Sequence, residues 1–113
     1  MRRAEIWLIS LDPTVGAEIR KTRPAVIVSS DDIGNLPLKV IAPLTDWKPR
    51  YEEVPWMVSV QPSAQNGLAK PSAVDAFQVR SVSQEQFVRK LGTLDEGVMQ
   101  RVAQALAEVL EIE

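Results

Sequence analysis

The sequence contains neither cysteine nor histidine. Without cysteine the chain forms no disulfide, no thiolate metal site and no thiol nucleophile. Without histidine it has no imidazole base, no Ser–His or Cys–His pair and no histidine-bound zinc. Any catalysis must therefore depend on carboxylates or on Arg, Lys, Ser, Thr or Tyr side chains. No metal or cofactor is expected.

Long apolar runs are missing as well. No stretch approaches the roughly 20 residues that span a bilayer, and the 45% hydrophobic and 25% charged residues are typical of a globular chain. A length of 113 residues suits one hydrophobic core, so we expect a single domain over residues 1–113.

The net charge of -2 combines two unlike halves. Residues 1–50 carry eight Lys or Arg against six Asp or Glu, and residues 51–113 carry five against nine. The first half therefore offers a local basic surface to an anion such as nucleic acid. Ordinary variation on a solvated surface is the alternative, and charge alone leaves both open.

Short β-rich segments dominate the first three quarters of the chain. We predict strands at residues 5–11, 25–29, 38–44, 56–60 and 73–82, with a polar loop at 45–55. The unbroken apolar run 25–29 is typical of a strand buried on both faces. Pro43 indicates that the third strand lies at an edge or ends there.

The C-terminal quarter changes to helical spacing. Ser83 and Gln86 have the spacing of a capping box, which predicts a short helix to about Lys90, ended by Gly92. A second such signal at residues 93–96 opens a longer helix. This helix is predicted to pack as a lid on the sheet, with partner binding as the alternative. Short strands followed by a terminal helix predict a small, strongly bent sheet or barrel.

Three clusters are candidates for chemistry. In the first, Arg20, Lys21 and Arg23 fall within four positions, and Pro24 fixes the backbone beside Arg23. The planar guanidinium of Arg23 donates two parallel hydrogen bonds, which suits a phosphate. A solvated basic loop is the alternative.

The second cluster begins with Thr45 at the end of a predicted strand. Its hydroxyl either enters a cleft or caps the backbone. Trp47 and neighbouring aromatic residues are interleaved with Lys48 and Arg50, a pattern that single-strand nucleic-acid binders use. For Trp56, the alternative to nucleic-acid binding is a position in the hydrophobic core.

The third cluster is on the last predicted strand. Alternation there places Asp75, Phe77 and Val79 on one face and Ala76, Gln78 and Arg80 on the other. Burial of Asp75 between apolar neighbours would raise the pKa of its carboxyl and suit it to act as a base. The alternative is that Asp75 is an exposed strand residue or a partner for Arg80.

In this order along the chain, the segments resemble the MazF/PemK family of toxin endoribonucleases of bacterial toxin–antitoxin modules. The resemblance covers nearly the whole sequence, and the run around Arg23 is its most specific part. The matching segments are RAEIWL at 3–8, LDPTVGAEI at 11–19, KTRPAVIVS at 21–29, IAPLT at 41–45, GL at 67–68, QVRSV at 78–82 and KLGTL at 90–94.

The resemblance implies a mainly β fold with a C-terminal helix, an SH3-like small β-barrel. It also implies a cytoplasmic homodimer with an RNA groove at its interface. The expected reaction is metal-independent, sequence-specific cleavage of single-stranded RNA, in which the 2′-hydroxyl attacks and leaves a 2′,3′-cyclic phosphate and a 5′-hydroxyl. A cognate antitoxin with an acidic, initially disordered tail is the implied protein partner.

The same resemblance assigns residues to roles. Arg23 matches the family's catalytic arginine and Thr45 its catalytic threonine, while Asp75 is the candidate general base. RNA-binding roles fall to Glu18, Arg20, Lys21, Trp47, Lys48, Arg50, Gln78 and Arg80.

This sequence departs from the family pattern at several positions. Ala4 stands where the family usually has glycine. In members that use histidine with aspartate, the acidic residue lies nearer the glutamine than Asp75 lies to Gln78, and Phe77 occupies that nearer place here. Ala4 and the missing histidine leave a second function open, and a related toxin family that shares the barrel leaves a third. The second is a non-catalytic barrel that binds RNA or a protein, and the third is a gyrase-poisoning toxin on the related fold.

Overall fold

The computed structural model describes residues 1–11 and 22–113. Its strands form one antiparallel sheet in the order β4-β5-β3-β2-β1-β7, with β6 paired to β3. The strands are β1 (Glu5–Ser10), β2 (Thr22–Ile27), β3 (Leu38–Asp46), β4 (Met57–Val60), β5 (Ser72–Asp75), β6 (Arg80–Ser83) and β7 (Phe87–Thr93). The helices are the 3₁₀ turns η1 (Pro49–Glu53), η2 (Ala76–Gln78) and η3 (Gln84–Gln86), and the α-helix α1 (Glu96–Leu110).

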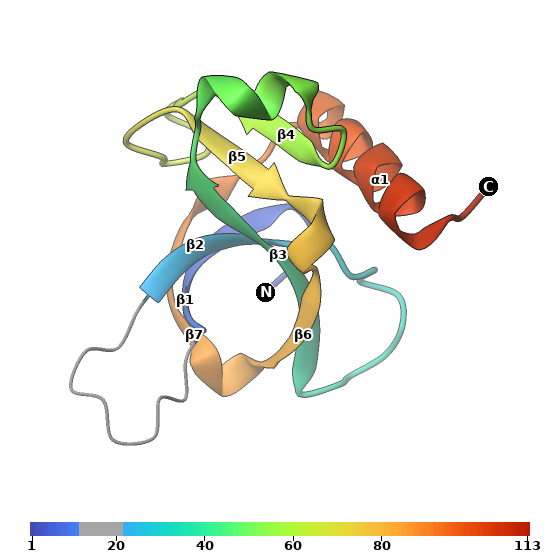
Figure 1. Ribbon diagram of the computed structural model, residues 1–113. Helices are drawn as coiled ribbons and strands as arrows, with labels where there is room; N and C mark the ends of the chain where they lie inside the picture. Colours follow the sequence, from blue (N-terminus) through green and yellow to red (C-terminus); the bar gives the residue numbers. More distant parts are fainter. Residues whose placement is uncertain (12–21) are drawn as a thin grey trace, which may run out of the picture.

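The predicted fold class, mainly β with a C-terminal helix, is confirmed. The strands β1, β2, β3, β6 and β7 curl around one another, while β4, β5 and α1 lie together at one end (Figure 1). No ladder joins β6 to β7 among the described residues, so the sheet is strongly curved but not closed. The term barrel therefore describes the curvature only loosely.

The strand β3 lies at the centre of the sheet, and the prediction that Pro43 marks an edge or a strand end is wrong. Pro43 pairs with Ala25 of β2, and β3 continues to Asp46. On its other side, β3 pairs with β6 through Ile41 and with β5 from Leu44 onward. Pro43 thus lies where the neighbouring strand changes, which is a position where a missing N–H breaks no ladder.

The long strand predicted over residues 73–82 is broken into β5, η2 and β6. The cause is Asp75, whose carboxylate accepts a hydrogen bond from the backbone N–H of Phe77 at 3.1 Å. This local bond competes with strand pairing and turns the chain. The predicted division of residues 75–80 between two faces is therefore wrong.

The capping box at Ser83 and Gln86 is present, but the helix it opens is only the three-residue turn η3. The predicted helix to Lys90 is wrong, because the chain continues as β7 and pairs with β1. Gly92 does not end a helix. It lies in β7, where an added Cβ would collide with the backbone carbonyl of Gln65.

The second predicted helix is confirmed as α1. The carboxylate of Asp95 caps it by accepting a hydrogen bond from the N–H of Val98 at 2.9 Å. Its Met99, Val102 and Ala105 side chains are buried. No helix in the two described ranges is both long enough and apolar enough to cross a membrane.

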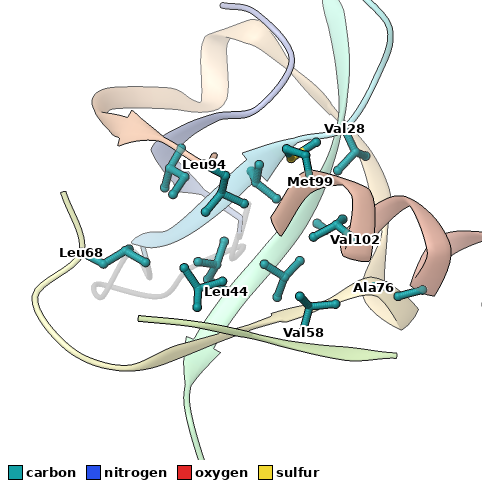
Figure 2. Close-up of a cluster of buried hydrophobic side chains, with 14 residues drawn as sticks. Val28, Leu44, Val58, Leu68, Ala76, Leu94, Met99 and Val102 are labelled. Atoms are coloured by element: carbon teal, nitrogen blue, oxygen red, sulfur yellow. The ribbon is translucent and has the colours of Figure 1, made fainter. Parts of the chain in front are cut away.

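The core consists of two clusters on opposite faces of the sheet. The larger one lies beneath α1, where Val102 and Leu94 meet Leu44 and Val58 (Figure 2). The smaller one fills the inside of the curved strands and includes Ile9, Ala25, Ile27, Ile41 and Val82. Because Ala25 and Ile27 face one cluster and Val26 the other, β2 is buried on both faces, as its sequence predicts.

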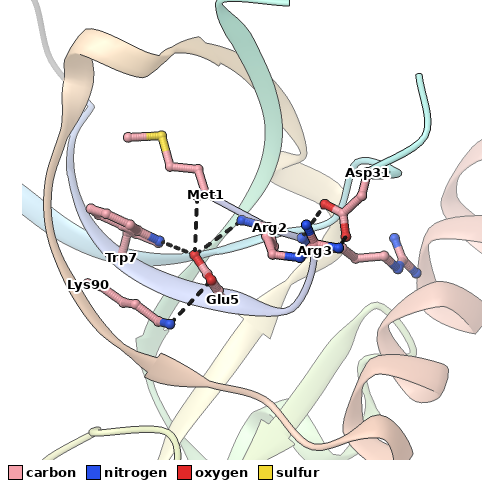
Figure 3. A network of polar contacts seen from close by, with 7 residues as sticks. All are labelled: Met1, Arg2, Arg3, Glu5, Trp7, Asp31 and Lys90. Carbon is pink, nitrogen blue, oxygen red and sulfur yellow. Dashed lines mark hydrogen bonds and ion pairs between the residues drawn. The ribbon is translucent and has the colours of Figure 1, made fainter. Parts of the chain in front are cut away.

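A polar network fixes the start of β1. The carboxylate of Glu5 accepts a hydrogen bond from the indole N–H of Trp7 at 2.9 Å and pairs with the ammonium of Lys90 at 3.2 Å (Figure 3). Beside it, Ala4 adopts a φ of 76° while its N–H donates to the carbonyl of Ile27 and its own carbonyl accepts from the N–H of Leu94. The backbone is therefore held in a left-handed conformation that glycine adopts more easily.

Candidate functional site

The pairing of β2 with β3 brings the two foremost sequence candidates to one place. Ala25 is opposite Pro43 in this ladder, and side chains two residues apart share a face of a strand. Extending the register by two residues places Arg23 opposite Thr45. Both side chains lie on the same face of the sheet as the buried Ala25 and Ile27. They lie at the end of the strands, where Arg23 is exposed and Thr45 is half-buried.

Arg23 and Thr45 line one pocket of about 380 Å³, which we call the Arg23–Thr45 pocket. Its walls come from β2, β3, η1, β4, β5, η2 and β6. The lining residues are Leu11, Arg23, Pro43, Leu44, Thr45, Tyr51, Met57, Asp75, Gln78 and Arg80. Residues far apart in sequence thus meet at a single site.

The break after Asp75 shapes the far wall of this pocket. The side-chain amide of Gln78 donates a hydrogen bond to Asp75 Oδ2 at 2.9 Å, so both carboxylate oxygens are engaged. Asp75, Gln78 and Arg80 then line the same pocket rather than alternating across a strand. Asp75 is 9% exposed, which places its carboxylate at the floor rather than the rim.

The ionisable side chains give the Arg23–Thr45 pocket a positive balance. Arg23 and Arg80 contribute two guanidinium groups, and Asp75 contributes one carboxylate. Neither arginine forms an ion pair with another residue of the described ranges. Two guanidinium groups and a threonine hydroxyl are donors for phosphate oxygens, so the pocket suits a phosphate group.

The other sequence candidates lie elsewhere. Trp47 lines a second cavity beside α1, in contact with Tyr51 at a ring-centroid distance of 5.8 Å. Lys48 and Arg50 are exposed, and the Arg50 guanidinium lies 5.3 Å from the centroid of the Tyr51 ring. Arg50 therefore lies beside a pocket residue without lining the pocket, and Lys48 directly precedes η1 on the surface.

Three candidates, Glu18, Arg20 and Lys21, lie outside the described residues. Their expected RNA-binding role stays a prediction from the sequence.

Five residues that line the pocket were not predicted as site residues: Leu11, Pro43, Leu44, Tyr51 and Met57. Met57 is opposite Asp75 in the β4–β5 ladder, and Tyr51 lies within η1 and lines the pocket from there. A methionine in a short strand carries no chemical signal, so only the strand register reveals Met57. Tyr51 was visible as one of the aromatic residues beside Lys48 and Arg50, but its position against Thr45 follows only from the fold.

The chain matches a known protein family over almost its full length. The model for PemK-like, MazF-like toxins of type II toxin–antitoxin systems matches residues 2–110. Endoribonuclease MazF9 of Mycobacterium tuberculosis is 29% identical over an alignment of 119 positions, which covers 99% of this chain and 98% of that protein. Endoribonuclease EndoA of Bacillus subtilis is 28% identical over 108 residues, covering 94% and 90%.

Solved structures share the fold. The Mycobacterium tuberculosis toxin MazF-mt6 superposes with a TM-score of 0.77 at 23% identity, covering 96% of this chain and 98% of its own. A MazE–MazF structure from Deinococcus radiodurans gives a TM-score of 0.80 at 20% identity, covering 100% and 97%. At these identities the likeness concerns the fold, including the curved sheet and its terminal helix.

Proposed function

The chain belongs to the family of PemK-like, MazF-like toxins of type II toxin–antitoxin systems, and we propose that it is a sequence-specific endoribonuclease that cleaves single-stranded RNA. Its full-length relatives that carry the name endoribonuclease support this activity. The observation that carries the proposal is the meeting of Arg23, Thr45 and Arg80 in one positively charged pocket.

The pocket suits a reaction in which RNA supplies its own nucleophile. The 2′-oxygen forms a bond to phosphorus, the bond to the 5′-oxygen breaks, and a 2′,3′-cyclic phosphate and a 5′-hydroxyl result. The protein then has to bind the phosphate, stabilise the phosphorane and assist two proton transfers. This chemistry requires no imidazole, which fits a chain without histidine.

Arg23 and Thr45 are the residues we assign to the phosphate. Arg23 donates hydrogen bonds to the equatorial oxygens of the phosphorane and to the leaving 5′-oxygen, which takes its proton from water, and Thr45 positions the scissile phosphate through its hydroxyl. Donors already fixed on β2 and β3 need no reorganisation when charge develops.

Asp75 is the carboxylate of the pocket and our candidate base. Accepting the proton of the 2′-hydroxyl requires one of its oxygens to exchange a present hydrogen bond for one to the substrate. The bond from Gln78 is the one that the substrate can replace, because both side chains line the pocket.

The remaining candidates guide RNA. Gln78 and Arg80 contact it in the pocket, and the exposed Lys48 and Arg50 attract its phosphates beside η1. Glu18, Arg20 and Lys21, outside the described residues, are assigned to RNA binding on the family resemblance alone.

We further propose that the protein acts in the cytoplasm as a homodimer and is inhibited by a cognate antitoxin. Among the similar solved structures is an endoribonuclease in complex with its cognate antitoxin from a mycobacterial species. The positive balance of the Arg23–Thr45 pocket fits an acidic antitoxin tail that folds as it binds and thereby excludes RNA.

Sequencing of 5′-hydroxyl ends from a mixed RNA pool, incubated with the purified protein in EDTA, tests the activity. We expect cleavage within a short common motif, and a rate reduced about 100- to 1,000-fold by Arg23→Ala. Arg2→Ala is the matched control, since Arg2 is exposed and Asp31 is the one described residue with which its guanidinium forms an ion pair. Tight RNA binding without product would instead support a non-catalytic binder, and an Arg23→Ala variant as fast as the parent would refute the assigned mechanism.

A further inference from the structure

A second cavity, of about 340 Å³, lies between η1 and α1, and we call it the η1–α1 cavity. Tyr51 and Met57 line both this cavity and the Arg23–Thr45 pocket. The two hollows therefore share a wall. A single strand with its scissile phosphate at Arg23 has a neighbouring nucleotide within reach of the η1–α1 cavity.

The lining of the η1–α1 cavity favours a nucleobase over a phosphate. Trp47 supplies a half-buried indole, on which a base can stack. Glu52 and Glu108 bring two carboxylates against the single guanidinium of Arg101. This negative balance repels a phosphate but accepts the N–H donors of a base.

The α1 side of the cavity carries both kinds of hydrogen-bonding group in a row. Arg101, Gln104 and Glu108 are spaced at i, i+3 and i+7, which places them along one face of the helix. All three are exposed, and none of them is in an ion pair with a residue of the described ranges. They are therefore available to a ligand.

Guanine matches this set best among the four bases. It alone offers two adjacent donors, N1–H and N2–H, to a carboxylate, together with two adjacent acceptors, O6 and N7, to a guanidinium. We propose that the η1–α1 cavity binds one guanine base of the RNA next to the cleavage site, stacked on Trp47 and read by Glu108 and Arg101. The proposal deepens the proposed function, since it assumes that RNA is the substrate.

Binding of single nucleotides tests the cavity without any cleavage. The chain has three tryptophans, so the indole N–H region of an ¹⁵N NMR spectrum holds three signals, and Trp47→Phe identifies that of Trp47. We expect guanosine monophosphate to shift the Trp47 signal, inosine monophosphate to bind about tenfold more weakly because it lacks the 2-amino group, and cytidine monophosphate to bind more weakly still.

Substitutions then separate the hydrogen bonds to the base from the stacking of the base on Trp47. Glu108→Gln should abolish the preference for guanosine over inosine monophosphate, whereas Glu96→Gln, on the same helix but outside the cavity, should retain it. Trp47→Leu should weaken both nucleotides about tenfold, and Trp47→Phe should preserve most of the affinity, measured on the Gln104 side-chain amide signal. Equal shifts by all nucleotides, or shifts confined to Trp7 or Trp56, would overturn the proposal.

Cleavage of the RNA pool provides the second arm. We expect guanine to be enriched at one position close to the cut, and Glu108→Gln to erase this enrichment while cleavage continues. If Glu108→Gln cleaves RNA at the same motif as the wild-type protein, the guanine site is refuted and the proposed endoribonuclease activity is not. A protein that binds guanosine monophosphate at Trp47 but cleaves no RNA contradicts the proposed endoribonuclease alone.

Discussion

The side-chain amide of Gln78 donates a hydrogen bond to the carboxylate of Asp75 at 2.9 Å. Because the other carboxylate oxygen accepts from the N–H of Phe77, Asp75 both ends β5 and holds Gln78 toward the Arg23–Thr45 pocket. One buried carboxylate thus has a structural task and, in our proposal, a chemical one. The two tasks are separable by substitution.

Asp75→Asn keeps an oxygen that accepts from Phe77 but removes the basic group. If Asp75 is the base, the cleavage rate falls about 100- to 10,000-fold. The melting temperature should change little, because the turn at η2 is preserved. An Asn variant that cleaves as fast as the parent would limit Asp75 to its structural task.

Thr45→Val removes one hydroxyl and keeps the shape and β-branching that suit β3. We expect the rate of RNA cleavage to fall about 100-fold while the melting temperature stays close to that of the parent. Thr45→Ser should restore most of the rate. Thr93→Val serves as the control in β7, away from the pocket, and a loss of rate in this variant equal to that of Thr45→Val would contradict a specific role.

Ala4→Gly should stabilise the protein. Relief of the left-handed conformation at a φ of 76° is worth about 1 kcal/mol, which raises the melting temperature by about 4 °C in a chain of this size. Ala103→Gly, at an exposed position within α1, should have the opposite effect of about 1 kcal/mol. Both are measured by thermal unfolding, and a lower melting temperature for Ala4→Gly would show that this backbone conformation carries no strain.

Glu5 gives the stability a dependence on pH. Burial raises the pKa of Glu5, but the hydrogen bonds from Trp7 and from the backbone of Arg2, with the Lys90 ammonium, bring that pKa below its ordinary value of 4.5. The folded state therefore favours the charged carboxylate. Its stabilisation is complete above about pH 4.5 and is lost as the pH falls through the lowered pKa.

Glu5→Gln should accordingly unfold at lower urea concentration than the parent at pH 7, and this difference should shrink as the pH is lowered below about 4.5. Glu85→Gln is the control, because Glu85 is exposed on η3. A difference between Glu5→Gln and the parent that stays constant over this pH range would mean that the carboxylate contributes no charge-dependent stability.

The sequence pattern was sufficient for elements whose own residues determine them. The apolar run of β2 and the helical spacing of α1 both predicted elements that the structure contains. The signals for β2 and α1 are local, so no knowledge of the folded chain was needed. The structure brings Arg23 and Thr45, which the sequence and the family resemblance had singled out, into one pocket, while their catalytic roles stay a prediction.

The errors arose where a distant strand decides the outcome. Residues 87–93 follow a genuine capping box, yet pairing with β1 makes them a strand. Taken alone, Gly92 indicates the end of a helix. In the structure, glycine is needed at this position because a Cβ would collide with the backbone carbonyl of Gln65, and no local sequence pattern reveals that contact. The position of Asp75 beside Gln78 and Arg80 depended likewise on a turn created by one side-chain hydrogen bond.

The Arg23–Thr45 pocket takes its walls from β2 through β6, and this origin determines when it first exists. A chain still being synthesised contains Arg23 and Thr45 long before β5, η2 and β6 have left the ribosome. Until Arg80 has emerged and β6 has paired with β3, the wall opposite Arg23 is missing. If the Arg23–Thr45 pocket is the site of cleavage, a nascent chain without Arg80 is not expected to cut the messenger that encodes it, because the site is assembled only once the polypeptide is nearly complete.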